Sequence, residues 1–530
     1  MLHNAVHAAV SRPTDRPHRR SRGLALVIIV GIGASVPAFA SQPAREAPVL
    51  SATVIQGVSA YSSAELYDTY RDQLGKPISR TTAQAVIAAI EQLYVKDGYS
   101  KPIVRVEGDL VASGLLRLEV AEPRITRVAV SGDAGPYAAR IDVLTAPLRD
   151  QRPVRKDSVQ QVLQRLRDLP GLSVTMTTQR DESTAGAYQL LVDADYQGLE
   201  GVVQVTNRGT EEIGPHFVLG QLVGNSLFGQ AEKLGLVFVS AADTREFRGG
   251  GGFVDLAAGG SGTRVALNGF RSISLPNEEP VDLSDEYIRD KISLKITQPL
   301  RFGTAVTAAV TGALEMDDLE IERNGAVLRD ERLRIVELGG RMSWRTGTHT
   351  QYLTTVEVRK GIDDFGSQLY AADLTDDPRR LDFLLTRAQV VRLSKISELW
   401  SWRIDALAQH SPYILPYNER FKIGGERLGR GFEVTEIAGD VGAGAKLELR
   451  CEIPGTPEFL GKASVYSFYD YGATWKQDID DSQSAATVGA GIGIRGASLT
   501  GYVEIAKPLT HADVEGDESA RVFAELSYKF

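Results

Sequence analysis

The residues best suited to specific chemistry lie in a glycine-rich segment near the C-terminus. Residues 421–432 read FKIGGERLGRGF, with four glycines between Gly424 and Gly431. This density of glycine disfavours a regular strand and favours a loop whose backbone approaches its neighbours closely. An arginine is always charged, and its planar guanidinium can bind a carboxylate through two parallel hydrogen bonds. The sequence therefore predicts a loop around residues 421–440 with an ion-pairing tip, formed by Gly429, Arg430, Gly431 and Phe432.

A carboxylate that suits this arginine follows in the next strand-like segment. Residues 468–472 read Phe-Tyr-Asp-Tyr-Gly, within an alternating run from Ser464 to Trp475. Alternate residues of a strand face the same side, so we expect one face to carry Phe468, Asp470 and Gly472. Taken singly, Arg430 and Asp470 could each be an ordinary solvated charge. Taken together, they predict an ion pair between the loop tip and this strand.

Many more alternating strands surround these two segments. From about residue 197 onward, apolar residues alternate with charged ones, as in Ile292-Ser-Leu-Lys-Ile296 and Trp400-Ser-Trp-Arg-Ile404. Two architectures fit this pattern, a soluble sandwich and a membrane barrel with a polar lumen. The roughly 330 residues available hold about 16 spanning strands with their turns, whereas a single soluble core rarely exceeds about 250–300 residues. We therefore favour an all-β barrel over residues 197–530, with strands after the loop near 441–453, 463–475, 486–497, 498–508 and 520–530.

The last ten residues, RVFAELSYKF, form a final alternating strand. Its apolar side carries Val522, Leu526, Tyr528 and Phe530, and the other side carries Glu525 and Lys529. A closing strand that ends in phenylalanine is similar to the outer-membrane signal that the barrel-assembly machinery reads. Tyr528 and Phe530 are the residues that would carry this signal.

The preceding part of the chain predicts two small α/β modules, at residues 50–122 and 123–196. In the first, Ser62 and Glu65 have the spacing of a capping box, for a helix that runs to about Leu74. A second helix from Thr82 places Val86, Ile90, Leu93 and Tyr94 on one face. In the second module, a helix capped by Asp157 or Ser158 ends at Leu169-Pro170-Gly171. Sheet edges of such modules can accept an extended partner strand, although the modules could also be simple spacers.

The first forty residues predict a secretion signal. Five arginines precede a short apolar stretch that begins at Leu24, and Ala38-Phe39-Ala40 fits a cleavage site. The stretch is too short for a spanning helix. We expect residues 1–40 to direct export from a bacterial cytoplasm.

Several motifs together resemble a known family, the two-partner secretion transporters of the outer membrane (haemolysin secretion/activation proteins of the ShlB/FhaC/HecB type). Leu93-Tyr94 with Gly98-Tyr99, the run Gly114-x-Leu116-x-Leu118-x-Val120, and Leu169-Pro170-Gly171 resemble its two POTRA domains. Arg430-Gly431-Phe432 resembles the RGF tip of the loop that this superfamily, which includes BamA, folds into its barrel. Gly429 replaces the hydrophobic residue that usually precedes the tip. Phe468, Asp470 and Gly472 match the F-x-D-x-G strand of the family.

The resemblance implies a fold, a location and a function. It implies α+β modules followed by an all-β domain, as two periplasmic POTRA domains and a C-terminal 16-stranded transmembrane β-barrel. The loop would then join strands 11 and 12. The implied function is translocation of a secreted exoprotein, resembling haemolysins or adhesins, across the bacterial outer membrane without nucleotide. The implied partners are this exoprotein, the barrel-assembly machinery and outer-membrane lipid.

Other functions are less well supported by the residues. The net charge of −9 does not provide the basic surface of a nucleic-acid-binding protein. No nucleotide-binding or hydrolytic motif is found, so we expect neither an enzyme nor a cofactor; with seven histidines and one cysteine, no metal is expected either. Gly489-x-Gly491-x-Gly493 lacks a surrounding βαβ unit, and we expect it to allow close packing. The alternatives are a BamA-type insertase or assembly factor and a passive porin or barrel enzyme.

Overall fold

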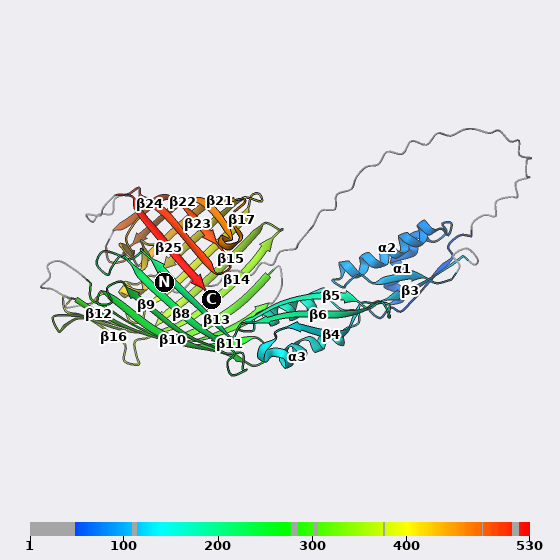
Figure 1. Cartoon of the computed structure of the whole chain (residues 1–530), viewed down its shortest axis with the longest axis horizontal. Coiled ribbons are helices and arrows are strands. Elements are labelled where there is room, and N and C mark those ends of the chain that lie inside the picture. Colours follow the sequence, from blue (N-terminus) through cyan, green and yellow to red (C-terminus); the bar gives the residue numbers. More distant parts are fainter. Residues whose placement is uncertain are drawn as a thin grey trace, which may run out of the picture.

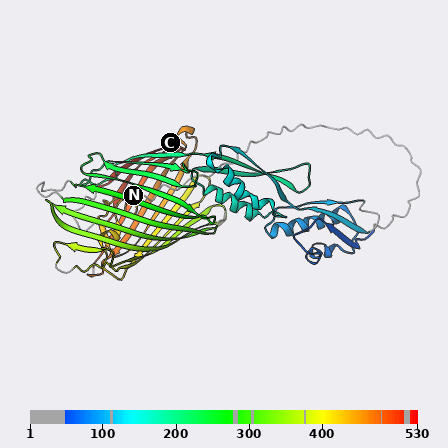
Figure 2. The same cartoon turned by 90° about the horizontal axis from the view of Figure 1, so that it is seen from below.

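The computed structural model describes residues 48–108, 114–276, 285–301, 306–374, 377–479, 481–510 and 519–530. The predicted secretion signal at residues 1–40 lies outside these ranges. Two α/β modules extend one after the other from one end of a barrel (Figures 1 and 2). None of the helices in the described ranges has the length and apolar character needed to cross a membrane.

The first module is a three-stranded sheet covered by two helices. Its sheet order is β1-β3-β2, with β1 parallel to β3 and β2 antiparallel to it. The core forms where Val86, Ile90 and Tyr94 of one helix meet Leu116 and Leu118 of the central strand. The elements are β1 (Ala52–Gln56), α1 (Ser63–Tyr70), η1 (Arg71–Gln73), α2 (Arg80–Lys96), β2 (Ile103–Val106) and β3 (Leu115–Ala121).

The second module repeats this arrangement, with sheet order β4-β6-β5. Its apolar core joins Ile141 and Leu148 of one helix, Val162 and Leu166 of the next, and Leu190 of the central strand. The elements are β4 (Arg124–Gly132), η2 (Gly135–Tyr137), α3 (Ala138–Arg149), α4 (Lys156–Arg167), β5 (Leu172–Arg180) and β6 (Ala187–Tyr196).

The turn Leu169-Pro170-Gly171 lies where the second module meets the barrel. Tyr137 Oη donates a hydrogen bond of 2.8 Å to the carbonyl of Pro170. The backbone N–H of Gln197, just before the first barrel strand, donates to the carbonyl of Gly171 at 2.8 Å. Ala231, from the turn between the second and third barrel strands, packs into the core of the module. This turn therefore fixes the module to the barrel.

Sixteen long strands of the described chain form a closed antiparallel barrel, which confirms the predicted fold class. A short extra strand, β16, adds to β14 at its far end. The barrel elements are β7 (Leu199–Thr206), β8 (Phe217–Asn225), β9 (Lys233–Ala241), β10 (Phe247–Ala258), β11 (Thr263–Ser274), β12 (Asp285–Arg301), β13 (Val306–Arg323), β14 (Ala326–Thr346), β15 (Thr350–Gly361), β16 (Gln368–Ala371), β17 (Leu384–Lys395), β18 (Trp400–His410), β21 (Val441–Ile453), β22 (Lys462–Trp475), β23 (Ser482–Arg495), β24 (Leu499–Pro508) and β25 (Arg521–Lys529). A 3-10 turn, η4 (Glu458–Leu460), precedes β22.

The barrel carries apolar side chains on its outside and charges on its inside. Ile292 and Leu294 on β12 are exposed, whereas Asp317 on β13 and Glu337 on β14 are buried. A soluble sandwich requires the reverse. A lipid-facing exterior and a polar lumen explain both observations, so the predicted alternation is that of a membrane barrel.

The barrel closes between its first and last strands, β7 and β25. Five residue pairs, from Glu525↔Thr206 to Lys529↔Val202, form the register. Beyond them, the backbone N–H of Asn207 donates to the carbonyl of Ala524 at 3.2 Å, and its side chain adds two bonds. Its Nδ2 donates to the carbonyl of Val522 at 3.0 Å, and its Oδ1 accepts from the N–H of Ala524 at 2.6 Å. At the other end, Phe530 and Gly201 exchange two backbone hydrogen bonds of 2.9 and 3.0 Å.

Several local predictions were wrong in detail. Helix α1 ends at Tyr70, four residues before the expected Leu74, and continues as a 3-10 turn. Helix α2 begins at Arg80, two residues before the expected start at Thr82, and is capped by Ser79. Helix α4 begins at Lys156 without a side-chain cap, so neither Asp157 nor Ser158 is its cap. Tertiary packing of the apolar faces sets these boundaries more strongly than the local cap signals do.

Candidate functional site: the loop inside the barrel

The segment between β18 and β21 folds back along the inner wall of the barrel. It contains the 3-10 turn η3 (Tyr417–Glu419) and a small hairpin of β19 (Phe421–Ile423) and β20 (Ile437–Gly439). Its apolar side chains form a cluster with inward-facing residues of the wall, made of Leu407, Phe421, Ile423, Leu428, Phe432, Ile437 and Ala485. The predicted loop therefore has a core of its own, and it joins strands 11 and 12 of the barrel.

The tip arginine is held by the predicted aspartate. Arg430 donates from Nε to Asp470 Oδ2 at 3.0 Å and from Nη2 to Asp470 Oδ1 at 2.8 Å. The backbone N–H of Arg430 also donates to Asp470 Oδ2, at 3.2 Å. Arg430 is 5% exposed and Asp470 is fully buried. Two parallel side-chain bonds and a backbone bond fix both the position and the orientation of the tip.

Other groups complete the surroundings of Arg430. The guanidinium carbon lies 3.4 Å from the centre of the Phe468 ring, in a cation–π contact. Its Nη1 lies 3.5 Å from Glu448 Oε2 and 3.7 Å from Glu504 Oε2. Phe468 and Asp470, two residues apart on β22, thus contact the arginine from one strand face, as the alternation predicts.

The glycines of the two motifs serve close packing. Gly429 has φ of +82°, which other residues rarely adopt. A Cβ on Gly431 would lie 2.9 Å from the backbone nitrogen of Pro508. On β22, a Cβ on Gly472 would lie 2.8 Å from Leu428 and 2.9 Å from Ile423 of the loop. Phe432 is buried in the loop cluster.

The contacts around the tip continue across the lumen as a chain of paired charges. Arg450 on β21 donates to Glu448 Oε1 at 2.7 Å. Tyr466 Oη donates to Glu504 Oε2 at 2.8 Å, and Arg208 forms an ion pair with the same glutamate. The chain contains three arginines and three carboxylates: Arg208, Arg430, Arg450, Glu448, Asp470 and Glu504. Equal numbers of opposite charges make it tolerable to bury them together.

The root of the loop has a second clamp, formed by Glu419. Arg359 donates to both carboxylate oxygens of Glu419 at 3.0 Å, and Arg387 donates to Oε2 at 3.1 Å. Arg359 also bonds Glu337 at 2.6 Å and Glu315 at 2.8 Å on the barrel wall. The loop is therefore held by arginine–carboxylate pairs at both its root and its tip.

The sequence named the central pair but missed the residues around it. Arg430 and Asp470 meet as predicted, and Phe468 and Gly472 contact the loop from the same strand. Glu448, Glu504 and the root pair Arg359–Glu419 were not singled out, because acidic and basic residues occur on nearly every inward face. Two-residue periodicity identifies which residues face inward, but it does not reveal which strands lie opposite one another.

The two residues of the expected assembly signal lie at the closing seam. The rings of Tyr528 and Phe530 stack with centroids 6.2 Å apart, and both side chains are about half exposed on the outer face. Gly201 of β7 lies directly beneath the Phe530 ring, where a Cβ would collide with it. The alternating glycines also have a packing role: Gly489 leaves room for Phe468, and Gly491 for Tyr466.

This arrangement positions a loop through ion pairs, hydrogen bonds and apolar contacts. The arginines and carboxylates at the tip pair with one another, with N···O distances from Arg430 of 2.8 Å to Asp470 and 3.7 Å to Glu504. Such pairs can break and re-form without a covalent step. The site is therefore suited to holding or releasing a segment inside a channel.

Comparisons with known proteins agree with this description. Residues 49–122 match the family model of the ShlB-type POTRA domain, and residues 312–496, which include Arg430 and Asp470, match that of the haemolysin secretion/activation protein ShlB/FhaC/HecB. The outer membrane transporter CdiB of Dickeya dadantii (strain 3937) is 22% identical over 435 residues, which cover 80% of this chain and 76% of that protein.

Solved structures share the fold. The structure of CdiB from Escherichia coli superposes with a TM-score of 0.73 at 19% identity, covering 93% of each chain. The structure of BamA from Haemophilus ducreyi lacking POTRA domains 1–3 gives 0.53 at 12% identity, covering 90% of this chain and 99% of that one. The similarity to BamA is thus more distant.

The fold, the inward loop and these matches define an outer-membrane transporter with periplasmic POTRA domains. More narrowly, the chain resembles two-partner secretion transporters of the ShlB/FhaC/HecB type over residues 49–122 and 312–496, and these matches support translocation of a partner exoprotein across the outer membrane.

Proposed function

We propose that the exported partner is a haemolysin-like or adhesin-like exoprotein, that the POTRA modules recognise it, and that it passes through the barrel past the Arg430 loop. The proposal has no catalytic step and needs no nucleotide. The observation that supports it most is the joining of two open-edged sheets to a barrel whose lumen contains a loop fixed by reversible ion pairs.

The outer edge of β5 is the best candidate for strand addition. Within the described residues, β5 pairs only with β6, over nine positions from Leu172 to Arg180. The edge strands of the first module, β1 and β2, have five and four residues. Natural edges are usually blocked by proline, lysine or a bulge, yet β5 has only Arg180, at its last position. Its length and composition favour pairing with an extended segment of the partner.

Proline substitutions test this edge. Along a strand, backbone N–H groups point alternately to the two sides, so one of Thr177 and Thr178 directs its donor away from β6. Proline at that position should remove an outward donor, leave the sheet intact and reduce export, while proline at the other should disrupt the β5–β6 pairing. Equal, wild-type export by both variants would contradict recognition at β5.

Export itself is measured by comparing secreted proteins with and without this gene. We expect a large exoprotein to disappear from the medium when the gene is deleted. A chain that lacks residues 50–196 should insert in the outer membrane but export nothing, and Arg430→Ala should reduce export more than barrel abundance. Normal secretion by both variants would contradict the roles given to the modules and the loop.

A role in inserting other barrels, as in BamA-type assembly factors, is the second candidate. Its support is the shared fold, at 12% identity. Loss of several unrelated outer-membrane proteins upon gene deletion, rather than of one exoprotein, would favour it. We further propose that the barrel-assembly machinery inserts this chain through its last strand, where Tyr528 and Phe530 lie, and that outer-membrane lipid surrounds the exposed apolar face.

A further inference from the structure

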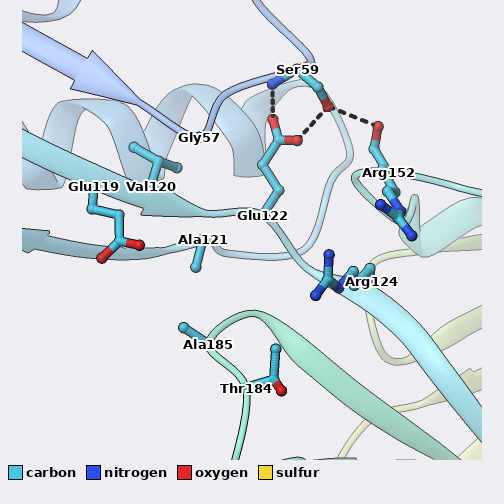
Figure 3. Close-up of a pocket in the computed structure, with 10 residues that line it drawn as sticks. All are labelled: Gly57, Ser59, Glu119, Val120, Ala121, Glu122, Arg124, Arg152, Thr184 and Ala185. Atoms are coloured by element: carbon cyan, nitrogen blue, oxygen red, sulfur yellow. Dashed lines mark hydrogen bonds between the residues drawn. The ribbon is translucent and has the colours of Figure 1, made fainter.

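A pocket of about 430 Å³ lies at the joint between the two POTRA modules (Figure 3). The end of β3 and the start of β4 form one side, and the turn between β5 and β6 forms another. Its charged side chains are Glu119, Glu122, Arg124 and Arg152. Small and apolar residues complete the lining, among them Val120, Ala121 and Ala185.

The joint around this pocket is fixed by hydrogen bonds between the modules. The N–H of Lys156 donates to the carbonyl of Gly98 at 3.0 Å, and the N–H of Ser100 donates to the carbonyl of Val154 at 3.4 Å. The guanidinium of Arg155 lies 4.9 Å from the centre of the Tyr99 ring. The walls of the pocket are therefore held in place before any ligand arrives, which reduces the entropy lost on binding.

Glu122 is fully engaged within the protein. Its Oε1 accepts hydrogen bonds from the N–H groups of Ser59 and Ala60 at 2.9 and 3.0 Å, and from Tyr94 Oη at 2.7 Å. Its Oε2 accepts from Ser59 Oγ at 2.5 Å. Figure 3 shows the carboxylate directed toward Ser59 and away from Arg124. Glu122 thus fixes the first module, and Figure 3 shows the other carboxylate of the lining, Glu119, on the side of the pocket opposite Arg124 and Arg152.

The guanidinium groups of the two pocket arginines have no partner within the part of the chain that the structure describes. Among the described residues, neither Arg124 nor Arg152 forms an ion pair or a hydrogen bond through its side chain, and Arg124 Nε is buried without an acceptor. Figure 3 shows both guanidinium groups on the same side of the pocket. A buried donor without an acceptor is costly, and more so on a charged group. A ligand that supplies an acceptor here would recover this cost.

We propose that the pocket binds a carboxylate side chain, aspartate or glutamate, on an extended segment of the exported partner. The proposal rests on the proposed function, since it extends recognition by the modules to the joint between them. A guanidinium binds a carboxylate through two parallel bonds, and two guanidiniums provide enough donors to satisfy both oxygens. The pocket is larger than a free carboxylate needs, and its apolar lining suits the aliphatic part of such a side chain.

The test measures peptide binding by the full-length protein in detergent micelles. The probe is a fluorescein-labelled Ser/Thr/Gly peptide that carries one Glu-Glu pair, with a Gln-Gln peptide as the matched control, read by fluorescence anisotropy. The Glu peptide should bind more tightly, and added salt should weaken its binding. The R124Q/R152Q variant should lose roughly tenfold or more in affinity, as expected for charge-assisted hydrogen bonds.

The control variant R117Q/R127Q removes the same charge from exposed arginines on β3 and β4, outside the pocket. It should bind the Glu peptide with nearly wild-type affinity. Protease resistance of the modules shows whether each variant is folded. Equal loss of affinity in both variants, or equal binding of the Glu and Gln peptides, would overturn the proposal.

Inorganic phosphate serves as the competitor that separates peptide recognition from binding of a free anion. If phosphate saturates the pocket and the Glu peptide does not displace it, the site is one for a small anion and the proposal fails. Export gives the independent readout. Normal export by R124Q/R152Q, together with lost export on deletion of residues 50–196, would reject the pocket and leave the proposed function standing.

Discussion

The interiors of the second POTRA module and of the barrel are built from opposite chemistry. In the module, the core is mainly apolar and includes the fully buried Ile141, Leu166 and Leu190. In the barrel, the buried side chains include Asp317, Arg359, Glu419 and Asp470, and many apolar residues, such as Ile292 and Leu294, are exposed on the outside. The module is held together by removing apolar surface from water, while the lumen is held together by matching charges. Burial alone therefore does not indicate what a substitution will cost.

This difference between an apolar core and an ion-paired lumen indicates which of the two regions can change its conformation. An apolar core loses contacts in every direction when it opens, so it unfolds as a unit. The lumenal loop is held by ion pairs at its root and tip and by one small apolar cluster, so it can leave its position when those pairs find other partners or water. The module is thus suited to presenting a rigid surface, and the loop to changing position.

The largest effect is expected for Asp470→Ala, which leaves Arg430 buried without its partner. Removing one member of a buried pair costs about 3–5 kcal/mol. We expect the loop to leave the wall, protease to cut between residues 421 and 440, and export to fall, while the folded barrel keeps its heat-modifiable mobility on gels. The control is Asp290→Ala, which breaks an exposed pair with Arg271 and should cost about 0–1 kcal/mol. Equal effects of the two substitutions would contradict the comparison.

Leu190→Ala tests the module in the same way. Leu190 is fully buried at the centre of its core, and truncation of such a leucine costs about 2–5 kcal/mol. The module should become sensitive to protease while the barrel remains intact. Val143→Ala, at a position that is 69% exposed on α3, should change little. If Leu190→Ala also released the loop, the two interiors would not be independent.

Gly472→Ala sharpens the comparison by adding a single methyl group to the lumen wall. The new Cβ would lie within 2.9 Å of Leu428 and Ile423, so the loop must shift, at a cost of about 1–3 kcal/mol. Increased protease access to the loop and partly reduced export are expected. Gly269→Ala on β11 is the matched control, because no atom lies within 4 Å of its added Cβ. Unchanged loop protection in Gly472→Ala would contradict the packing role of this glycine.

The smallest effect concerns pH and the first module. Burial raises the pKa of Glu122, but hydrogen bonds from Ser59, Tyr94 and Ala60 outweigh it and hold the pKa below its ordinary value. The stabilisation is therefore complete above the ordinary glutamate pKa of about 4.3, and it is lost as pH falls through the lower pKa of the folded state. Glu122→Gln should reduce thermal stability at neutral pH, with a difference from wild type that narrows in acid.

Glu119→Gln provides the control for this pH dependence. Glu119 is exposed on β3, three residues before Glu122, so its substitution should leave the acid sensitivity of the module unchanged. A difference between Glu122→Gln and wild type that stays constant with pH would show that charge on Glu122 does not stabilise the joint.

The sequence predicted most of the barrel because its signal is local. The alternation of Ile292, Leu294 and Ile296 places them on one face whatever their neighbours are, and the five strands expected after the loop match β21 to β25 within a few residues. The sequence did not predict the bounds of helix α3, because Pro136 and Pro147 suggest interruptions of a helix. In the structure, Pro136 lies in the 3-10 turn η2 that precedes α3, and Pro147 lies near the C-terminal end of α3.

The central pair of the site was predictable because each member lies in an unusual local context, Arg430 between two glycines and Asp470 between tyrosines. The contact of Glu504 with Arg430 was not predictable, because the position of Glu504 depends on the register between β23 and β24. The Arg359–Glu419 clamp joins residues 60 positions apart through the inward fold of the loop. Such contacts are set by tertiary geometry, which a single sequence does not contain.

The amide of Asn207 has a consequence for the order in which the barrel forms. It bonds the backbone of β25 across separations of 315 and 317 positions in the chain. Contacts between such distant residues cannot form until the intervening chain has been made and ordered. The cylinder is therefore open along one side until the very end of its assembly. Until then, the unpaired edges of β7 and β25 must be protected from aggregation, and the amide of Asn207 is among the last groups to form its bonds across them.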